Sequence, residues 1–154
     1  MDIKRYLTSM MLVLIRDKRK KADFIRKYKL IHHMGEKCRY QPNKLPSELF
    51  LLSIHNNVSV ATNLTSCTHD IICDVFDGNE IYPGSRRQAF YMGKIEVYDN
   101  VVIGVNSLIM YNTKIGPNAI IAAGSVVTHD IPEGAIVGAT RQGYWECLGS
   151  AKKA

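Results

Sequence analysis

The triplet Thr68–His69–Asp70 brings together three side chains that can hold or move a proton. Histidine is the commonest general base in proteins, because its ring changes protonation state near neutral pH. The triplet stands directly before an irregular stretch, residues 71–93, that interrupts an otherwise regular pattern. We therefore predict that His69 is a general base beside a loop. From the residues alone, a structural or surface role for a single histidine stays open.

The pattern on both sides of this loop has a period of six residues. One phase carries an aliphatic residue each time: Val97, Ile103, Ile109, Ile115, Ile121 and Val127. Four positions later stands a mostly small residue: Val101, Ser107, Thr113, Ala119 and Ser125. An amphipathic helix repeats every three or four residues, and a half-buried strand every two. A period of six is typical of a parallel β-helix built from hexapeptide repeats.

Each hexapeptide is expected to form one short strand and one turn, so that three of them close a triangular coil. Asparagine recurs at the same spacing: Asn100, Asn106, Asn112 and Asn118. Asparagine tolerates the left-handed backbone conformation that a tight corner requires. The predicted fold class is mainly β, a left-handed parallel β-helix with an N-terminal helical cap and one loop excursion. The left hand is implied by the resemblance of the repeat to known hexapeptide-repeat proteins and not by general strand geometry, because connections between parallel strands are usually right-handed.

We divide the chain into a basic helical cap (1–30), a β-helix domain (31–138) with its excursion at 71–93, and a C-terminal tail (139–154). Residues 1–44 carry 13 Lys and Arg but only 4 Asp and Glu. The cations interleave with apolar residues: Arg16, Lys18, Arg19, Lys20, Lys21, Arg26, Lys27 and Lys29. This pattern indicates a solvated helical cap that covers the open end of the coil. Weak contact with an anionic membrane surface is the alternative, and no nucleic-acid motif accompanies the charge.

Composition suits one domain, with 154 residues of which 46% are hydrophobic. No segment reaches the roughly 18 apolar residues of a membrane span, and we predict no signal peptide. The four cysteines form no CxxC pair. A reduced bacterial cytoplasm is therefore the expected location.

The stretch from Gly93 to Val137 resembles the hexapeptide-repeat acyltransferases, with Ala122-Ala123-Gly124-Ser125 among its repeats. Together with Ile54–Asn63 and the Thr68–His69–Asp70 triplet, it resembles the bacterial sugar O-acetyltransferases of the maltose, galactoside and capsular polysaccharide type. The resemblance covers residues 31–138. It implies a homotrimer that binds acetyl-CoA in grooves between neighbouring coils and transfers the acetyl group to a sugar or polysaccharide-precursor hydroxyl.

The resemblance also implies roles for single residues. His69 matches the catalytic base of these enzymes, and Val105 and Ala123 match positions whose backbone serves CoA. Thr128 and His129 match a Thr-Lys pair near the nucleotide end of CoA. His129 therefore replaces a permanent cation.

The tail departs from the same family after Gly138. It reads Ala-Thr-Arg instead of the usual Asn-Pro-Ala and a basic residue, so Arg141 is a candidate for the missing charge. Candidates for acceptor binding are Asp70, Arg86, Arg87 and Tyr91. Loop packing and trimer contacts explain the excursion residues equally well.

Three other functions are compatible with such a coil. A sugar N-acetyltransferase would share fold and co-substrate, and a non-catalytic scaffold would fit the altered tail. A γ-type carbonic anhydrase needs three zinc-binding histidines, two of them close in sequence. His55, His69 and His129 lack that pairing, and we expect no metal.

Overall fold

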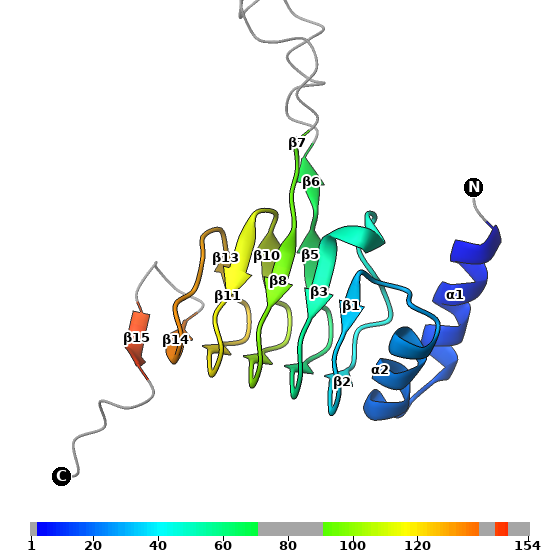
Figure 1. The fold of residues 1–154 in the computed structure, drawn as a ribbon, viewed down its shortest axis with the longest axis horizontal. Coiled ribbons are helices and arrows are strands. Elements are labelled where there is room, and N and C mark those ends of the chain that lie inside the picture. Colours follow the sequence, from blue (N-terminus) through cyan, green and yellow to red (C-terminus); the bar gives the residue numbers. More distant parts are fainter. Residues whose placement is uncertain (1–2, 71–90, 139–143, 148–154) are drawn as a thin grey trace, which may run out of the picture.

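The computed structural model describes residues 3–70, 91–138 and 144–147. The chain winds into a three-sided coil whose faces are three sheets, with two helices at its N-terminal end and one hairpin leaving it (Figure 1). The first sheet contains β1 (His33–Met34), β3 (Leu52–Ile54), β8 (Ile95–Val97) and β11 (Thr113–Ile115). The second sheet contains β2 (Arg39–Tyr40), β4 (Ser59–Val60), β9 (Val102–Ile103), β12 (Ile120–Ile121), β14 (Ala135–Val137) and β15 (Tyr144–Cys147). The third sheet contains β5 (Thr65–Cys67), β10 (Leu108–Met110) and β13 (Val126–Val127).

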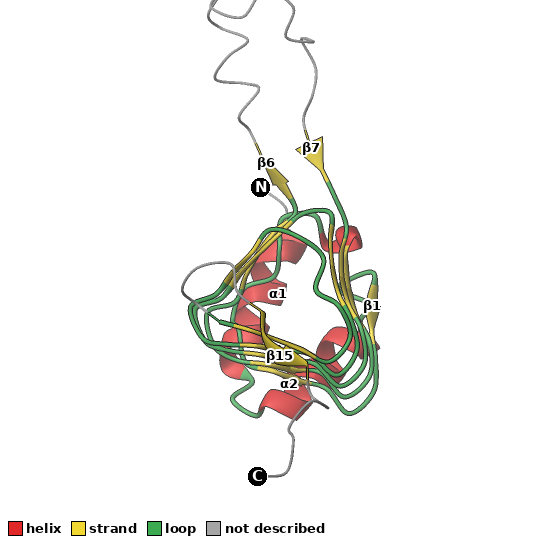
Figure 2. Ribbon diagram, turned by 90° about the vertical axis from the view of Figure 1, so that its left-hand side faces the viewer, coloured by secondary structure: helices red, strands yellow, loops and turns green. Residues whose placement is uncertain are grey.

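The coil is left-handed, as predicted. In Figure 2 the C-terminal end faces the viewer, and the chain runs clockwise from the first sheet to the second and then the third while it approaches. Pairs within these three sheets are parallel, apart from β14 with β15. The predicted fold class is therefore confirmed, including the N-terminal helices, α1 (Ile3–Leu14) and α2 (Lys18–Lys27).

The interior of the coil consists of stacked aliphatic columns. In the first sheet Ile54, Val97 and Ile115 are in register, and each is at most 1% exposed. The second sheet stacks its inward residues in the same way: Val60, Ile103 and Ile121. The small residues of the repeat are also fully buried: Val101, Ser107, Thr113, Ala119 and Ser125. Both phases of the sequence period therefore point inward, which leaves only the outer faces and corners for function.

The corners hold the asparagines in the left-handed backbone region, as predicted. Six of them have φ between 54° and 60°: Asn57, Asn63, Asn100, Asn106, Asn112 and Asn118. Their side chains also bond from turn to turn, since Asn57 donates to Asn100 at 2.9 Å and Asn100 donates to Asn118 at 3.0 Å. The corner between the first and second sheets is thus held by a ladder of side-chain amides.

One corner glycine gives a stability prediction. A Cβ at Gly104 would lie 2.4 Å from the backbone nitrogen of Ala123, so Gly104→Ala forces two turns apart. We expect a loss of about 2 kcal/mol in the free energy of unfolding, measured by urea denaturation. Gly124→Asn is the control, because Gly124 has a φ of 71° and asparagine already occupies equivalent corners. An equal loss in both variants would contradict this account.

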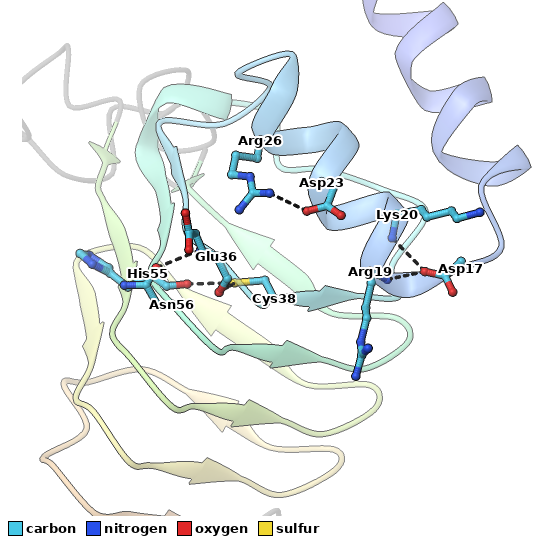
Figure 3. Close-up of polar contacts among 9 residues, drawn as sticks. All are labelled: Asp17, Arg19, Lys20, Asp23, Arg26, Glu36, Cys38, His55 and Asn56. Atoms are coloured by element: carbon cyan, nitrogen blue, oxygen red, sulfur yellow. Dashed lines mark hydrogen bonds and ion pairs between the residues drawn. The ribbon is translucent and has the colours of Figure 1, made fainter.

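Helix α2 covers the N-terminal end of the coil by contacts with β1 and β2 (Figure 1). Asp17 caps it, accepting from the backbone N–H groups of Arg19 and Lys20 at 2.9 Å, as Figure 3 shows. The prediction of a solvated basic face is wrong for Lys21, which is 4% exposed. Its ammonium donates to the Asn43 side chain at 2.7 Å and the Gln41 carbonyl at 3.1 Å. These acceptors compensate for burial, which lowers the pKa of Lys21.

At the other end, β15 pairs antiparallel with β14, so the tail contains a strand that its irregular sequence does not predict. Arg141 falls in 139–143, outside the described residues. None of the helices in the described ranges reaches the length and apolar character that crossing a bilayer demands.

Candidate active site

His69 lies at the third corner, where the chain passes from the third sheet back to the first. It begins β6 (His69–Asp70), which pairs antiparallel with β7 (Tyr91–Met92) to form a hairpin that leaves the coil (Figure 2). The Gly93 N–H donates to the Thr68 carbonyl at 2.9 Å and closes the base of that hairpin. A rigid coil thus fixes the backbone of His69 on both sides, which is what a positioned base requires.

Glu48 holds the His69 ring. Its Oε2 lies 2.7 Å from Nδ1 of His69 and also accepts from the Thr68 hydroxyl at 2.5 Å. The His69 and Glu48 side chains are 29% and 18% exposed. Burial alone raises the pKa of Glu48, but hydrogen bonds from Thr68 and His69 outweigh it and bring the pKa below the ordinary 4.5. Glu48 is therefore a carboxylate at neutral pH.

This carboxylate decides which ring nitrogen of His69 carries the proton. A carboxylate only accepts hydrogen bonds, so Nδ1 must be the donor and Nε2 of the neutral ring keeps its lone pair. The same carboxylate would stabilise an imidazolium if Nε2 took up a proton. Glu48 and His69 therefore form a carboxylate–histidine pair in which Nε2 has the tautomer that a general base requires.

Asp70 is tied to the next turn of the coil. The Tyr111 hydroxyl donates a short hydrogen bond to Asp70 Oδ2. That bond, together with burial, raises the pKa of Tyr111. Tyr91, opposite Asp70 in the hairpin, is 53% exposed. Asp70 and Tyr91, two of the residues predicted to bind the acceptor substrate, thus lie beside His69. The other two, Arg86 and Arg87, lie outside the described residues.

The predicted cofactor residues occupy two different corners. Thr128 and His129 follow β13 at the third corner, where the Thr128 hydroxyl and His129 Nδ1 are 2.8 Å apart. Strand β13 is two strands from β5, so this pair lies roughly 10 Å along the corner from His69. Val105 and Ala123 lie at the second corner, between the second and third sheets. A single coil does not bring these two groups together.

Backbone donors are available at that second corner. Val105 is 43% exposed, and Ala123 is also exposed. Among the described backbone hydrogen bonds, neither N–H donates to a carbonyl. The arrangement suits amide recognition by backbone groups, as a pantetheine chain requires.

Glu48 and Tyr111 are the site residues that the sequence analysis missed. Glu48 lies before the short 3-10 helix Leu49–Leu51, in a stretch without the six-residue period. Tyr111 lies between two repeats.

His55, which was weighed as a zinc ligand, is 3.4 Å from Glu96 and stacks on Tyr98. In the described ranges, no three His, Cys, Asp or Glu residues are grouped to hold a metal.

The left-handed coil, its asparagine corners and its inward aliphatic columns define a β-helix protein built from hexapeptide repeats. Residues 96–129 match the family described as bacterial transferase hexapeptide (six repeats). The chain is 27% identical over 107 residues to a Bacillus subtilis strain 168 protein named "Putative acetyltransferase YvoF", covering 68% of this chain and 54% of that protein. The chain thus spans about half the length of that curated relative.

Two solved structures share the fold. A hexapeptide-repeat acetyltransferase of Vibrio cholerae, complexed with acetyl-CoA, is 21% identical with a TM-score of 0.60, covering 94% of this chain and 86% of that one. A maltose O-acetyltransferase of Clostridium difficile 630 is 23% identical with a TM-score of 0.51, covering 87% and 80%. The expected resemblance to hexapeptide-repeat acetyltransferases is thereby confirmed.

Proposed function

We propose that this chain is an acetyl-CoA-dependent O-acetyltransferase that modifies a hydroxyl of a sugar or polysaccharide precursor. The observation that carries the proposal is the Glu48–His69 pair at the base of the hairpin, which leaves Nε2 as an oriented base. The resemblance to a maltose O-acetyltransferase and to an acetyl-CoA-bound acetyltransferase supports the acyl donor and the class of acceptor. The location we propose is the cytoplasm, in keeping with four cysteines that form no CxxC pair.

In the proposed reaction, Nε2 of His69 takes the proton from the acceptor hydroxyl as its oxygen attacks the thioester carbonyl. The carbon–sulfur bond then breaks, and the imidazolium returns the proton to the departing thiolate of CoA. Glu48 stabilises the imidazolium between these two proton transfers. A backbone N–H near the carbonyl would stabilise the developing oxyanion.

Binding of acetyl-CoA calls for two copies of the chain. His69, Thr128 and His129 lie at the third corner, and Val105 and Ala123 at the second. A seam between the third corner of one copy and the second corner of the next would bring both groups to one cofactor. Repeating that seam around a threefold axis gives a closed trimer in which each third sheet faces the axis.

The outer surfaces of the sheets support this arrangement. On the third sheet, Leu108 and Val126 point outward and lie opposite each other on the paired strands β10 and β13. Val126 is 62% exposed. The outer positions of the first sheet are polar instead: His33, Ser53, Glu96 and Lys114. Burying the apolar surface at the axis and leaving the polar surface in solvent is the favourable choice.

We expect light scattering to give about three times the chain mass of 17.3 kDa. Val126→Glu should break the assembly, because it places a carboxylate at the axis in every copy. Val102→Glu is the matched control, an exposed strand valine on the second sheet. Monomers that retain full activity would refute the shared site.

The acceptor class is tested by thiol release from acetyl-CoA across a panel of sugars and amino sugars. Release with neutral sugars supports O-acetylation, whereas release only with amino sugars favours the N-acetyltransferase alternative. If the chain neither binds acetyl-CoA nor releases thiol with any acceptor, it is a scaffold and the proposed function is wrong.

A further inference from the structure

Helix α1 carries an apolar stripe that no described part of the chain covers. Leu7, Met10, Met11 and Leu14 follow the spacing of one helix face and are 45–70% exposed. Leu12, on the other side of the helix, is 1% exposed and packs into the core. The stripe therefore faces away from the protein, although its residues would be buried in an ordinary helix.

Cations gather immediately after this stripe. Seven exposed basic side chains lie between the end of α1 and the residues that follow α2: Arg16, Lys18, Arg19, Lys20, Arg26, Lys27 and Lys29. Two acids are interspersed, and both are engaged: Asp17 caps α2, and Asp23 pairs with Arg26 at 2.8 Å (Figure 3). The α1 stripe and these cations belong to the two helices at the N-terminal end of the coil (Figure 1), and together we call them the basic cap.

The positive charge of the basic cap indicates which kind of surface can bind to it. A second copy would bring the same cations against the first, and their repulsion opposes that pairing. An anionic lipid surface matches both parts, because acyl chains accept the stripe and phosphates attract the cations. We propose that the basic cap docks the protein reversibly on an anionic lipid bilayer, with α1 lying in the plane of the headgroups.

The position of the cap is compatible with docking. Figure 1 shows α1 at the far N-terminal end of the coil, opposite β15 and away from the hairpin β6–β7. A bilayer at that end leaves the corner of His69 open. In the proposed trimer, the three caps point to the same end, so weak contacts of single caps would add up to avidity. Docking does not itself depend on acetyl transfer.

The test is sedimentation of the full chain with vesicles of phosphatidylcholine that contain about one third phosphatidylglycerol. We expect binding to these vesicles, loss of binding as salt rises, and little binding to pure phosphatidylcholine. Binding to neither type of vesicle would overturn the proposal. Equal binding to both, insensitive to salt, would overturn its electrostatic part.

Matched variants separate the two contributions. Lys20→Gln with Lys27→Gln should weaken binding by about 25-fold, since each cation near an anionic surface is worth roughly fivefold. Lys114→Gln on β11 is the charge control. Met10→Gln with Leu14→Gln should weaken binding by about tenfold. Val13→Gln is the polarity control, because Val13 is 57% exposed but faces the groove toward α2.

Oligomer mass, measured on the same variants, distinguishes lipid from protein as the occupant. If Met10→Gln with Leu14→Gln dissociates the assembly and leaves vesicle binding unchanged, the stripe packs against another copy and the proposal is wrong. Thiol release in solution should stay at the wild-type rate in all four variants. Failure of the proposed catalysis would leave vesicle binding unaffected.

Discussion

Alanine in place of His69 is expected to lower the turnover of acetyl transfer by about 10²–10⁴-fold, the usual effect of removing a general base. The variant lacks Nε2, so no side chain in the described site takes the acceptor proton in its place. The affinity for acetyl-CoA should change little, because the proposed CoA contacts of Val105 and Ala123 are made by backbone groups. Thiol release at saturating acceptor, together with calorimetric titration of CoA, measures both quantities.

His55→Ala is the matched control for that experiment. His55 is also a half-buried histidine beside a glutamate, with Nε2 3.4 Å from Glu96, but it directly follows β3 of the first sheet and is not part of the hairpin. Its loss should leave turnover within a few-fold of wild type. Turnover of His69→Ala similar to that of His55→Ala would remove His69 from the chemistry.

Replacement of Glu48 by glutamine is expected to lower turnover by about 10²-fold, the upper range for loss of a carboxylate that orients a functional histidine. Glutamine keeps the size and can still hydrogen-bond to Thr68 and His69. It removes the negative charge that stabilises the imidazolium and no longer dictates which ring nitrogen carries the proton. Glu96→Gln, at the other histidine–glutamate pair, is the control.

Two further measurements separate positioning by Glu48 from a general structural effect. In a His69→Ala background, Glu48→Gln should cost almost nothing more, because both act through one proton transfer. The pKa of Glu48 is depressed below 4.5 in the folded protein, so its contribution to stability is present above about that pH. That contribution is lost as the pH falls through the depressed value. Glu48→Gln should therefore flatten the acid limb of the stability profile, and full additivity of the two substitutions would argue against the pair.

The coil could be predicted because its sequence is locally periodic. Every sixth residue must be aliphatic because it enters the narrow interior of the coil. The fold can therefore be recognised from the local sequence, without knowledge of long-range contacts. The asparagine corners could be predicted for the same reason, because a left-handed backbone restricts the residue type at each corner. The position of His69 was also predictable, because it stands where the period stops.

The partners of His69 could not be predicted in this way. Glu48 precedes His69 by 21 residues and lies in a segment with no period, so only the folded coil brings their side chains together. Burial of Lys21 has the same origin, because its acceptors lie about twenty residues further along the chain. Residue type indicated a solvated cation there, and three-dimensional packing reversed that expectation.

The antiparallel pairing of β15 with β14 has a consequence for self-association. A parallel coil ends in strands whose backbone N–H and C=O groups could pair with another coil, and identical turns would let such pairing continue without limit. Strand β15 runs against the direction of the stack, so it cannot template a further turn of the same kind. At the opposite end α2 lies over β1 and β2. A repetitive architecture that resembles a fibril in its backbone is in this way kept to a finite length.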